Sequence, residues 1–171
     1  DAASRAASVR GALLEVGAVL ADGRVTRTEL VELLRKPMAE LVADGNVLLT
    51  WQDGDEFEMA PVRRGFGTGL AARRGRLSQL QRDRWQAGGA HVNQDVQLTD
   101  IYGASVVTEI PTKVRALVTA PLVGLPDGEL AALWVHSEQP HGFSEAQIEG
   151  LELIGRLLGS SMASGGTELA E

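Results

Sequence analysis

The stretch that decides the fold runs from Val114 to Met162 and reads VRALVTAPLVGLPDGELAALWVHSEQPHGFSEAQIEGLELIGRLLGSSM. It opens with an apolar run, Val114–Val123, whose valines and threonine favour a strand. A Pro-Asp-Gly turn at 126–128 leads into a second apolar run, Glu129–Ser137. A capping box of the form S-x-x-Q then begins at Ser144 and marks the start of a helix. The stretch therefore predicts two strands joined by a turn, followed by a C-terminal helix that ends near Met162.

Two further helices are predicted at the N-terminal end of the chain. Apolar residues recur at steps of three and four from Ala2 to Ala21, as on one face of an amphipathic helix. A capping box that joins Thr26 to Glu29 starts the second helix, which we expect to continue to about Asp44. Pro37 lies inside this second helix, and we expect it to kink or break the helix because proline has no amide hydrogen.

A hairpin and a long variable segment occupy the middle of the chain. Val47–Trp51 and Glu56–Val62 read as strands on either side of an Asp-Gly turn, with odd- and even-numbered residues of the first strand on opposite faces. Leu77, Leu80 and Trp85 share a helical spacing, which predicts a short helix over residues 77–87. Residues 88–113 are weakly patterned, and a loop of this length inside a domain is usually functional. We expect this segment to form a lid over a ligand pocket.

Length and composition are those of a single folded domain. The chain has 171 residues, of which 44% are hydrophobic and 23% are charged, and it contains no apolar run long enough to span a bilayer. It contains no cysteine, which excludes disulfides, a thiolate nucleophile, thiolate metal ligands and thioether-linked chromophores. The absence of cysteine fits a reducing compartment, so we expect a cytoplasmic protein without a membrane partner. Because the chain begins at Asp1 rather than Met, we expect it to be a fragment of a longer protein.

The formal net charge of −7 argues against nucleic-acid binding by this domain. One window departs from that balance, because residues 63–84 hold seven arginines and a single acid, Asp83. The window has two interpretations: a solvated helix face whose arginines pair with acids elsewhere, or a site for an anion or a protein partner.

A pocket built from the middle segment and the later strands would draw on six polar or aromatic side chains. The candidate ligand-binding residues are Trp85, His91, Tyr102, Arg115, Thr119 and Trp134. Three more arginines, Arg73, Arg74 and Arg76, join them if the ligand is an anion, because a guanidinium binds a carboxylate or a phosphate through two hydrogen bonds. Each candidate also has a purely structural interpretation, with the tryptophans as core residues and Arg115 as a member of a surface ion pair.

The remaining titratable groups predict neither a metal site nor a catalytic centre. His91 precedes Asn93 and Asp95, but one histidine among scattered acids in a loop is typical of polar surface. His136 is expected at an edge or rim of the sheet, with its side chain on the face opposite to that of Trp134. No serine lies in a G-x-S-x-G turn, so a Ser-His-acid triad is not predicted. We therefore expect no catalytic residue and no metal.

From residue 8 to residue 163, the order of these elements resembles that of GAF domains, which are small-molecule sensors. The resemblance is carried by LLEVGAVLADG and ELVELLRKPMAELVADGNVLLTWQDGDEFEMAPV, by RGFGTGLAARRG in the centre, and by the A-P-L strand, the strand GELAALWV and the helix start P-x-x-F-S-E-x-Q. It implies an α+β fold with a central antiparallel sheet of five to six strands. The N- and C-terminal helices would cover one face, and variable loops or helices would cover the other face, where the pocket lies.

The resemblance also bears on the ligand. Bilin-binding members attach the chromophore through a cysteine, and free methionine sulfoxide reductases of this fold need redox cysteines, so this chain matches neither group. Cyclic-nucleotide-binding members carry an N-K-F-D-E motif that has no counterpart here. Haem-binding sensor kinases place a histidine in the loop before the A-P-L strand, and here that loop, Thr108–Lys113, contains none. The cofactor therefore stays unidentified, with bilin excluded and haem not expected.

By this resemblance, residues 1–163 form one sensory domain and residues 164–171 form a linker toward an output domain. The domain is expected to bind an unidentified small molecule without catalysing a reaction. It would relay the signal through its terminal helices in bacterial signal transduction or transcription regulation, and it would form a homodimer through those helices. The alternative is a GAF module that has lost its ligand and serves only dimerisation or protein interaction.

Overall fold

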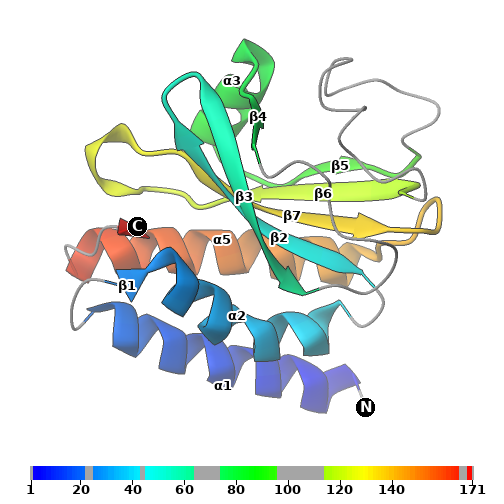
Figure 1. Cartoon of the computed structure of the whole chain (residues 1–171). Coiled ribbons are helices and arrows are strands. Elements are labelled where there is room, and N and C mark those ends of the chain that lie inside the picture. The colour runs from blue at the N-terminus through cyan, green and yellow to red at the C-terminus, as the bar shows by residue number, and fades with distance from the viewer. Residues whose placement is uncertain are drawn as a thin grey trace.

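The computed structural model describes residues 2–21, 25–42, 45–63, 74–95, 114–165 and 169–170 of the chain. Its centre is a six-stranded sheet in which neighbouring strands are antiparallel, in the order β4-β3-β2-β7-β6-β5 (Figure 1). The strands are β2 (Asn46–Asp53), β3 (Glu56–Arg63), β4 (Arg74–Arg76), β5 (His91–Asn93), β6 (Ala116–Pro121) and β7 (Ala131–Ser137). The predicted antiparallel sheet is therefore confirmed.

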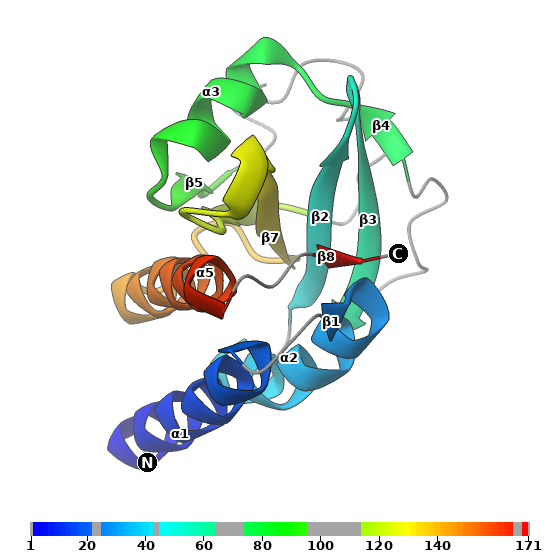
Figure 2. The ribbon, with the colours of Figure 1, turned by 90° about the vertical axis from the view of Figure 1, so that its left-hand side faces the viewer.

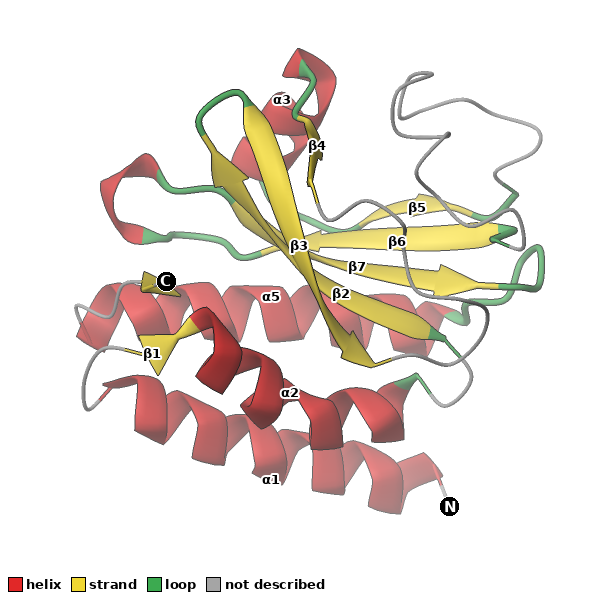
Figure 3. Cartoon of the chain, in the orientation of Figure 1, coloured by secondary structure: helices red, strands yellow, loops and turns green. Residues whose placement is uncertain are grey.

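Helices lie on both faces of this sheet (Figures 1 and 2). On one face, α2 (Arg27–Leu41) packs against β3, α5 (Glu145–Gly165) packs against β6 and β7, and α1 (Ala2–Ala21) packs against both of these helices. The short helix α3 (Gln79–Ala87) lies on the opposite face, as Figure 3 shows by colour. This arrangement confirms the predicted α+β class with the terminal helices on one face. Within the described ranges, no helix combines the length and the hydropathy that crossing a membrane requires.

The second helix begins where the sequence predicts but is not broken at its proline. Thr26 caps α2, because its Oγ1 accepts a hydrogen bond from the amide of Glu29 (3.1 Å) and the Glu29 carboxylate accepts one from the amide of Thr26 (2.8 Å). The helix then continues through Pro37 to Leu41, so of the two predicted effects, a kink or a break, the break does not occur. Pro37 and Met38 are both buried, and this burial holds the last turn in helical form although one amide is missing.

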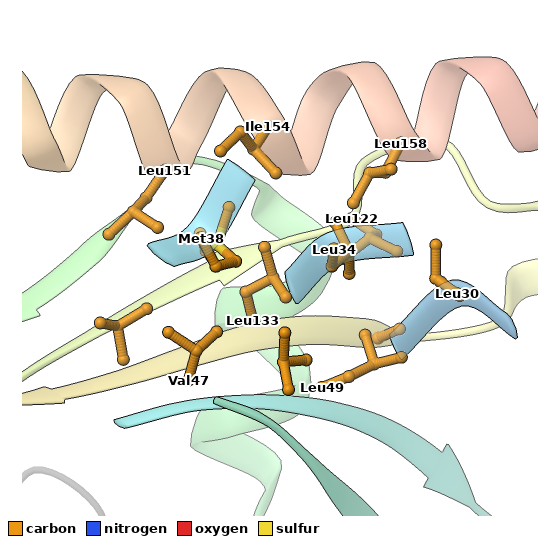
Figure 4. Close-up of a cluster of buried hydrophobic side chains, with 14 of the residues drawn as sticks. Leu30, Leu34, Met38, Val47, Leu49, Leu122, Leu133, Leu151, Ile154 and Leu158 are labelled. Atoms are coloured by element: carbon orange, nitrogen blue, oxygen red, sulfur yellow. The ribbon is translucent and has the colours of Figure 1, made fainter. Parts of the chain in front are cut away.

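The sheet face beneath the helix layer is apolar. Odd-numbered residues of β2, Val47, Leu49 and Trp51, point to this face, as the hairpin pattern predicts, and they lie opposite Val135, Leu133 and Ala131 of β7. Figure 4 shows Leu34 and Met38 of α2 converging with Leu151, Ile154 and Leu158 of α5 on this surface. Burial of these side chains is what holds the helix layer to the sheet.

The C-terminal helix approaches the end of β6 so closely that two of its positions have no room for a side chain. A Cβ atom at Gly155 would overlap the carbonyl oxygen of Pro121, and a Cβ atom at Gly159 would overlap the carbonyl oxygen of Val123. The amide of Val123 donates a hydrogen bond to the carbonyl of Gly155 (3.4 Å). Helix and strand end are therefore in backbone contact.

His136 departs from both expectations drawn from the sequence. It is 1% exposed and lies in β7, between β2 and β6, rather than at an edge or rim of the sheet. Its side chain and that of Trp134 point to the same face, because side-chain direction in a strand repeats every two residues. Burial lowers the pKa of His136 from 6.5 to about 4, so the imidazole is neutral at neutral pH.

Two short strands connect the ends of the helix layer. β1 (Val25–Thr26) and β8 (Leu169–Ala170) pair in parallel, with Thr26 opposite Ala170. The residue that caps α2 therefore also pairs with the segment that follows α5.

Replacing Gly159 with alanine tests the backbone contact of α5. The added methyl group overlaps a carbonyl oxygen that belongs to the backbone and cannot rotate away, so we expect a loss of about 2 kcal/mol or more in the free energy of unfolding, measured by urea denaturation. Gly11→Ala in α1 is the control. No atom lies within 4 Å of its Cβ position, and this variant should be stabilised by roughly 0.5–1 kcal/mol. Equal stability of the two variants would contradict the contact.

The lowered pKa of His136 makes the stability depend on pH. Between the unfolded pKa of 6.5 and the folded value of about 4, the unfolded chain takes up a proton here and the folded chain does not. The free energy of unfolding should therefore fall as the pH drops through this window, by up to roughly 3 kcal/mol. Urea denaturation across the window should show a steeper loss for the wild type than for His136→Leu, whereas the variant His141→Asn, at an exposed site, should behave as the wild type. Parallel curves for wild type and His136→Leu would refute the assignment.

Candidate functional site

Buried polar side chains gather on the sheet face that carries α3. In the described part of the chain, the buried polar residues are Asn46, Thr50, Gln81, Asn93, Thr119 and His136. Strand register places them together, because Asn46 lies opposite His136, and Asn93 and His136 both lie opposite Leu117. The cluster under the helix layer consists of apolar residues. Burying a polar group costs free energy unless it finds a hydrogen-bond partner, so this asymmetry marks the α3 face as the candidate site.

Three of the six predicted ligand-binding residues form one row across three strands. His91 of β5 lies opposite Thr119 of β6, which lies opposite Trp134 of β7. Thr119 and Trp134 are buried, and His91 is partly buried. Burial, together with the nearby positive charge of Arg84, lowers the pKa of His91 and favours its neutral form. The row therefore combines an aromatic ring, a hydroxyl group and a neutral imidazole.

The helix α3 brings a fourth predicted residue, Trp85, against this row. The ring centroids of Trp85 and Trp134 are 6.3 Å apart in an edge-to-face arrangement, and Phe57 packs against Trp134 at 5.0 Å. Both tryptophans belong to a second apolar cluster, so they also fill core space, as their structural interpretation holds. Gln81, one helical turn before Trp85, is 1% exposed, and its Nε2 has no hydrogen-bond partner among the described residues. The aromatic end of the site thus includes a buried amide donor.

Arg115 belongs to the same face through an ion pair. Its Nη2 lies 3.3 Å from Oδ2 of Asp95, and both side chains are partly buried, with 32% and 15% exposed. Asn93 of β5 lies opposite Leu117 of β6. Asp95 lies two residues after Asn93, and Arg115 lies two residues before Leu117, so both side chains of the ion pair point to the same face as these two residues. A guanidinium held in this way can bind a carboxylate or a phosphate, and the ion pair also fits the structural interpretation of Arg115.

Two predicted residues, Tyr102 and Arg73, lie outside the described residues, as does most of the segment predicted to form a lid. Arg74 and Arg76 lie in β4, at the far edge of the sheet from β5 and β6, so the structure does not bring them to the row formed by His91 and Thr119.

Two arginines of the arginine-rich window, Arg74 and Arg82, form ion pairs with the hairpin. Arg74 contacts the carboxylates of three residues, Asp53, Glu56 and Glu58. The hydrogen bonds that the Arg74 guanidinium donates to Asp53 and Glu56 raise its pKa. Arg82 contacts Asp55 at 3.2 Å. For these two arginines the structure favours the interpretation as charges that pair with acids elsewhere in the chain.

Five of the six buried polar residues were not among the predicted ligand-binding residues: Asn46, Thr50, Gln81, Asn93 and His136. Gln81 ends an S-x-x-Q capping box that begins at Ser78, the same pattern that marks the start of α5, and that pattern predicts its helical position. The two-residue step from Trp134 predicts the face of His136. Asn46 carries no such signal, because its burial depends on pairing with a strand far along the chain.

The site offers stacking and hydrogen bonding. His91 Nε2 and His136 Nδ1 have no hydrogen-bond partner in the described ranges, and each neutral imidazole can donate or accept. No three histidine, aspartate or glutamate side chains converge as metal ligands within those ranges. The arrangement can therefore hold a small molecule that has a flat or apolar part and several polar groups.

Comparison with known proteins identifies the fold. No family model and no curated protein matches the chain. Among solved structures, it is similar to a free methionine-R-sulfoxide reductase from Neisseria meningitidis in complex with its substrate, at 24% identity over 94% of this chain and 92% of that one, with a TM-score of 0.63. It is also similar to the GAF domain of an Acinetobacter phosphoenolpyruvate-protein phosphotransferase, at 13% identity over 95% of both chains, with a TM-score of 0.63.

These likenesses contradict the prediction that the chain is not an enzyme. The Neisseria protein and two further neighbours are free methionine-R-sulfoxide reductases, so this fold carries catalysis as well as sensing. The prediction failed because it treated the fold as one of sensors and looked for triads and metal ligands, whereas function depends on the site built into a fold. Since the chain contains no cysteine, a thiol group is not available to it.

A further solved GAF domain matches over 92% of this chain with a TM-score of 0.62. The six-stranded antiparallel sheet and the helices packed on it form the α+β fold that these neighbours share. The chain has a GAF-like fold.

Proposed function

We propose that this domain is a sensory module that binds a small molecule on the sheet face beneath α3. One observation carries the proposal: the buried polar side chains of the described residues all lie on that face or on α3. Two of these side chains, Gln81 and His136, each have a buried nitrogen atom without a hydrogen-bond partner among the described residues. Each such atom costs about 1–3 kcal/mol, so a protein that served only as a scaffold would gain stability by replacing these two residues with apolar ones. A ligand that supplies the missing partners accounts for their presence.

The proposed ligand has an apolar or aromatic part and polar groups at its edges. Trp85, Trp134 and the neighbouring apolar side chains would contact the apolar part, and His91 and Thr119 would bind the polar edge. Arg115 would contact an acidic group if the ligand carries one. Tyr102 remains a candidate from the sequence alone.

The sheet connects this site with the helix layer. Thr119 lies in β6, and the residues at the end of β6 are in backbone contact with Gly155 and Gly159 of α5. A ligand that binds one of two conformations more tightly shifts their populations, and a shift of β6 would move α5 because the two backbones touch. We propose that residues 1–163 form this sensory unit, and that residues 164–171 lead to an output domain in bacterial signal transduction or transcription regulation.

Native mass spectrometry of the gently purified domain tests ligand binding. We expect a mass excess that is absent from the denatured protein, because a pocket with unpaired polar groups retains its ligand. Arg115→Gln should weaken retention roughly tenfold if the ligand is acidic, since a charge-assisted hydrogen bond is lost. The control is Arg156→Gln on α5, whose ion pair with Glu152 (2.7 Å) lies in the helix layer. A clean apo mass, with no thermal stabilisation by any member of a panel of amino acids, nucleotides and organic acids, would contradict the proposal.

A second candidate, a dimerisation module, is favoured by exposed apolar residues on the terminal helices. Leu14 of α1 is 67% exposed, and Leu153 and Leu157 of α5 are 49% and 36% exposed, although leucine is usually buried. Because α1 and α5 pack against each other, these leucines belong to one helix layer. We propose that a homodimer in the cytoplasm forms through this layer, without contact to membrane or nucleic acid.

The double variant Leu14→Glu and Leu153→Glu tests the dimer. Placing two carboxylates in an apolar interface leaves charges without partners, so we expect a dimer in sedimentation velocity for the wild type and a monomer for the variant. Leu80→Glu on α3, at a leucine that is 47% exposed, is the matched control and should stay dimeric. A monomeric wild type at high concentration would rule the dimer out.

A further inference from the structure

A pocket lies on the other side of the sheet from the proposed sensory site. It has a volume of about 440 Å³, and its lining residues belong to α2, β2 and β3. Arg27, Glu32 and Arg35 line it from α2, and Trp51 and Glu58 line it from the sheet. Volumes of this size are typical of small-molecule sites. No residue of this pocket belongs to the α3 face, because Trp51 and Glu58 are register partners that point toward the helix layer.

The two walls of this pocket differ in electrostatic character. The wall formed by α2 carries two arginines and one glutamate, and it includes the first turn of the helix, where the helix dipole is positive. The wall formed by the sheet carries the carboxylate of Glu58 and the indole ring of Trp51, whose face attracts cations. An anionic group is therefore favoured at α2, and a cationic group is favoured at the sheet.

The position of Arg27 shows that the sheet wall accepts a cation. Its guanidinium carbon lies 4.4 Å from the centroid of the Trp51 ring, and its Nη1 lies 4.0 Å from Glu58. Glu58 also contacts Arg74, so this carboxylate attracts two cations from different elements. A third cationic group, supplied by a ligand, would meet the same acceptors.

Replacing the ion pair between Arg35 and Glu32 with a contact to a ligand costs little stability. Arg35 and Glu32 pair at 3.1 Å with more than half of each side chain exposed. Exposed pairs of this kind contribute about 0–1 kcal/mol. Arg35 can therefore turn toward a ligand carboxylate without a large loss of stability.

We propose that this pocket between α2 and β3 is a binding site for a small zwitterion with an apolar body, of the amino-acid type. The carboxylate would bind Arg35 of α2, the ammonium group would bind Glu58 and the Trp51 ring beside Arg27, and the apolar body would lie on Val31 and the indole. A molecule with only one of the two charges meets one wall of the wrong sign. The pocket thus selects for both charges on one molecule.

The pocket between α2 and β3 also lies next to β8, the strand near the C-terminal end of the chain. Thr26, which pairs with Ala170 of β8, directly precedes Arg27 of the pocket wall. An occupant of the pocket therefore touches the first turn of α2, next to the strand that holds the segment after α5.

The signals of the three tryptophans distinguish binding at the α2 pocket from binding at the α3 face in one experiment. Trp51 lies at the α2 pocket, whereas Trp85 and Trp134 lie on the α3 face. In ¹⁵N-labelled full chain, the indole N–H signals are assigned with Trp→Phe variants and followed during titration with three probes. The probes are L-phenylalanine, 3-phenylpropanoate, which lacks the ammonium group, and 2-phenylethylamine, which lacks the carboxylate. We expect saturable movement of the Trp51 signal with L-phenylalanine, at an affinity roughly tenfold or more above that of either analogue.

Variants of each wall complete the test. Arg35→Gln on the helix wall and Glu58→Gln on the sheet wall should each weaken L-phenylalanine binding about tenfold or more, with the fold verified by unchanged signals of Trp85 and Trp134. Arg156→Gln, which removes an exposed arginine from a similar ion pair on α5, should leave binding unchanged. The proposal is overturned if the Trp51 signal does not move saturably, if a single-charge analogue binds as well as the zwitterion, or if only Trp85 and Trp134 respond. The last result would instead support the sensory site on the α3 face.

Discussion

The burial of one sheet face beneath α1, α2 and α5 is the constraint on which the rest of this domain depends. That face is apolar along β2, β6 and β7, and the side chains of α2 and α5 fill the space above it (Figure 4). Because strand side chains alternate, polar residues in the same strands must point to the other face. The central strand β7 illustrates this division, since Leu133 and Val135 face the helices while Trp134 and His136 face away from them. The place of the candidate site follows from the place of the helices.

Two glycines of α5 bring the helix layer into direct backbone contact with the sheet. Gly155 and Gly159 lie against the backbone at the end of β6, so movement of the strand and movement of the helix are linked directly, without a side chain that could adapt between them. This contact joins α5 to the end of β6, the strand that carries Thr119. In the proposed sensory function, this contact would couple a ligand on one face to the helix layer on the other.

The GAF-like fold by itself does not separate sensing from catalysis. Solved structures with this fold include GAF domains and free methionine-R-sulfoxide reductases. What distinguishes members is the chemistry of the residues in the site, and in this chain the site combines neutral imidazoles, indole rings and one guanidinium without any thiol. The pocket between α2 and β3 has a different character, because charged groups of both signs line it.

Local patterns in the sequence determined most of the secondary structure. The capping boxes at Thr26 and Ser144, the Asp-Gly turn and the apolar alternation of β2 each depend on residues within a few positions, so they could be read without knowing the fold. The same patterns, together with the resemblance to GAF domains, predicted the antiparallel sheet and the layer of terminal helices. Only the tertiary structure decided which strands lie in the middle of the sheet, and therefore that Asn46 and His136 are buried side by side and that Arg74 lies far from Thr119. The physical reason is that burial and charge pairing depend on contacts between residues distant in sequence, which short-range spacing does not encode.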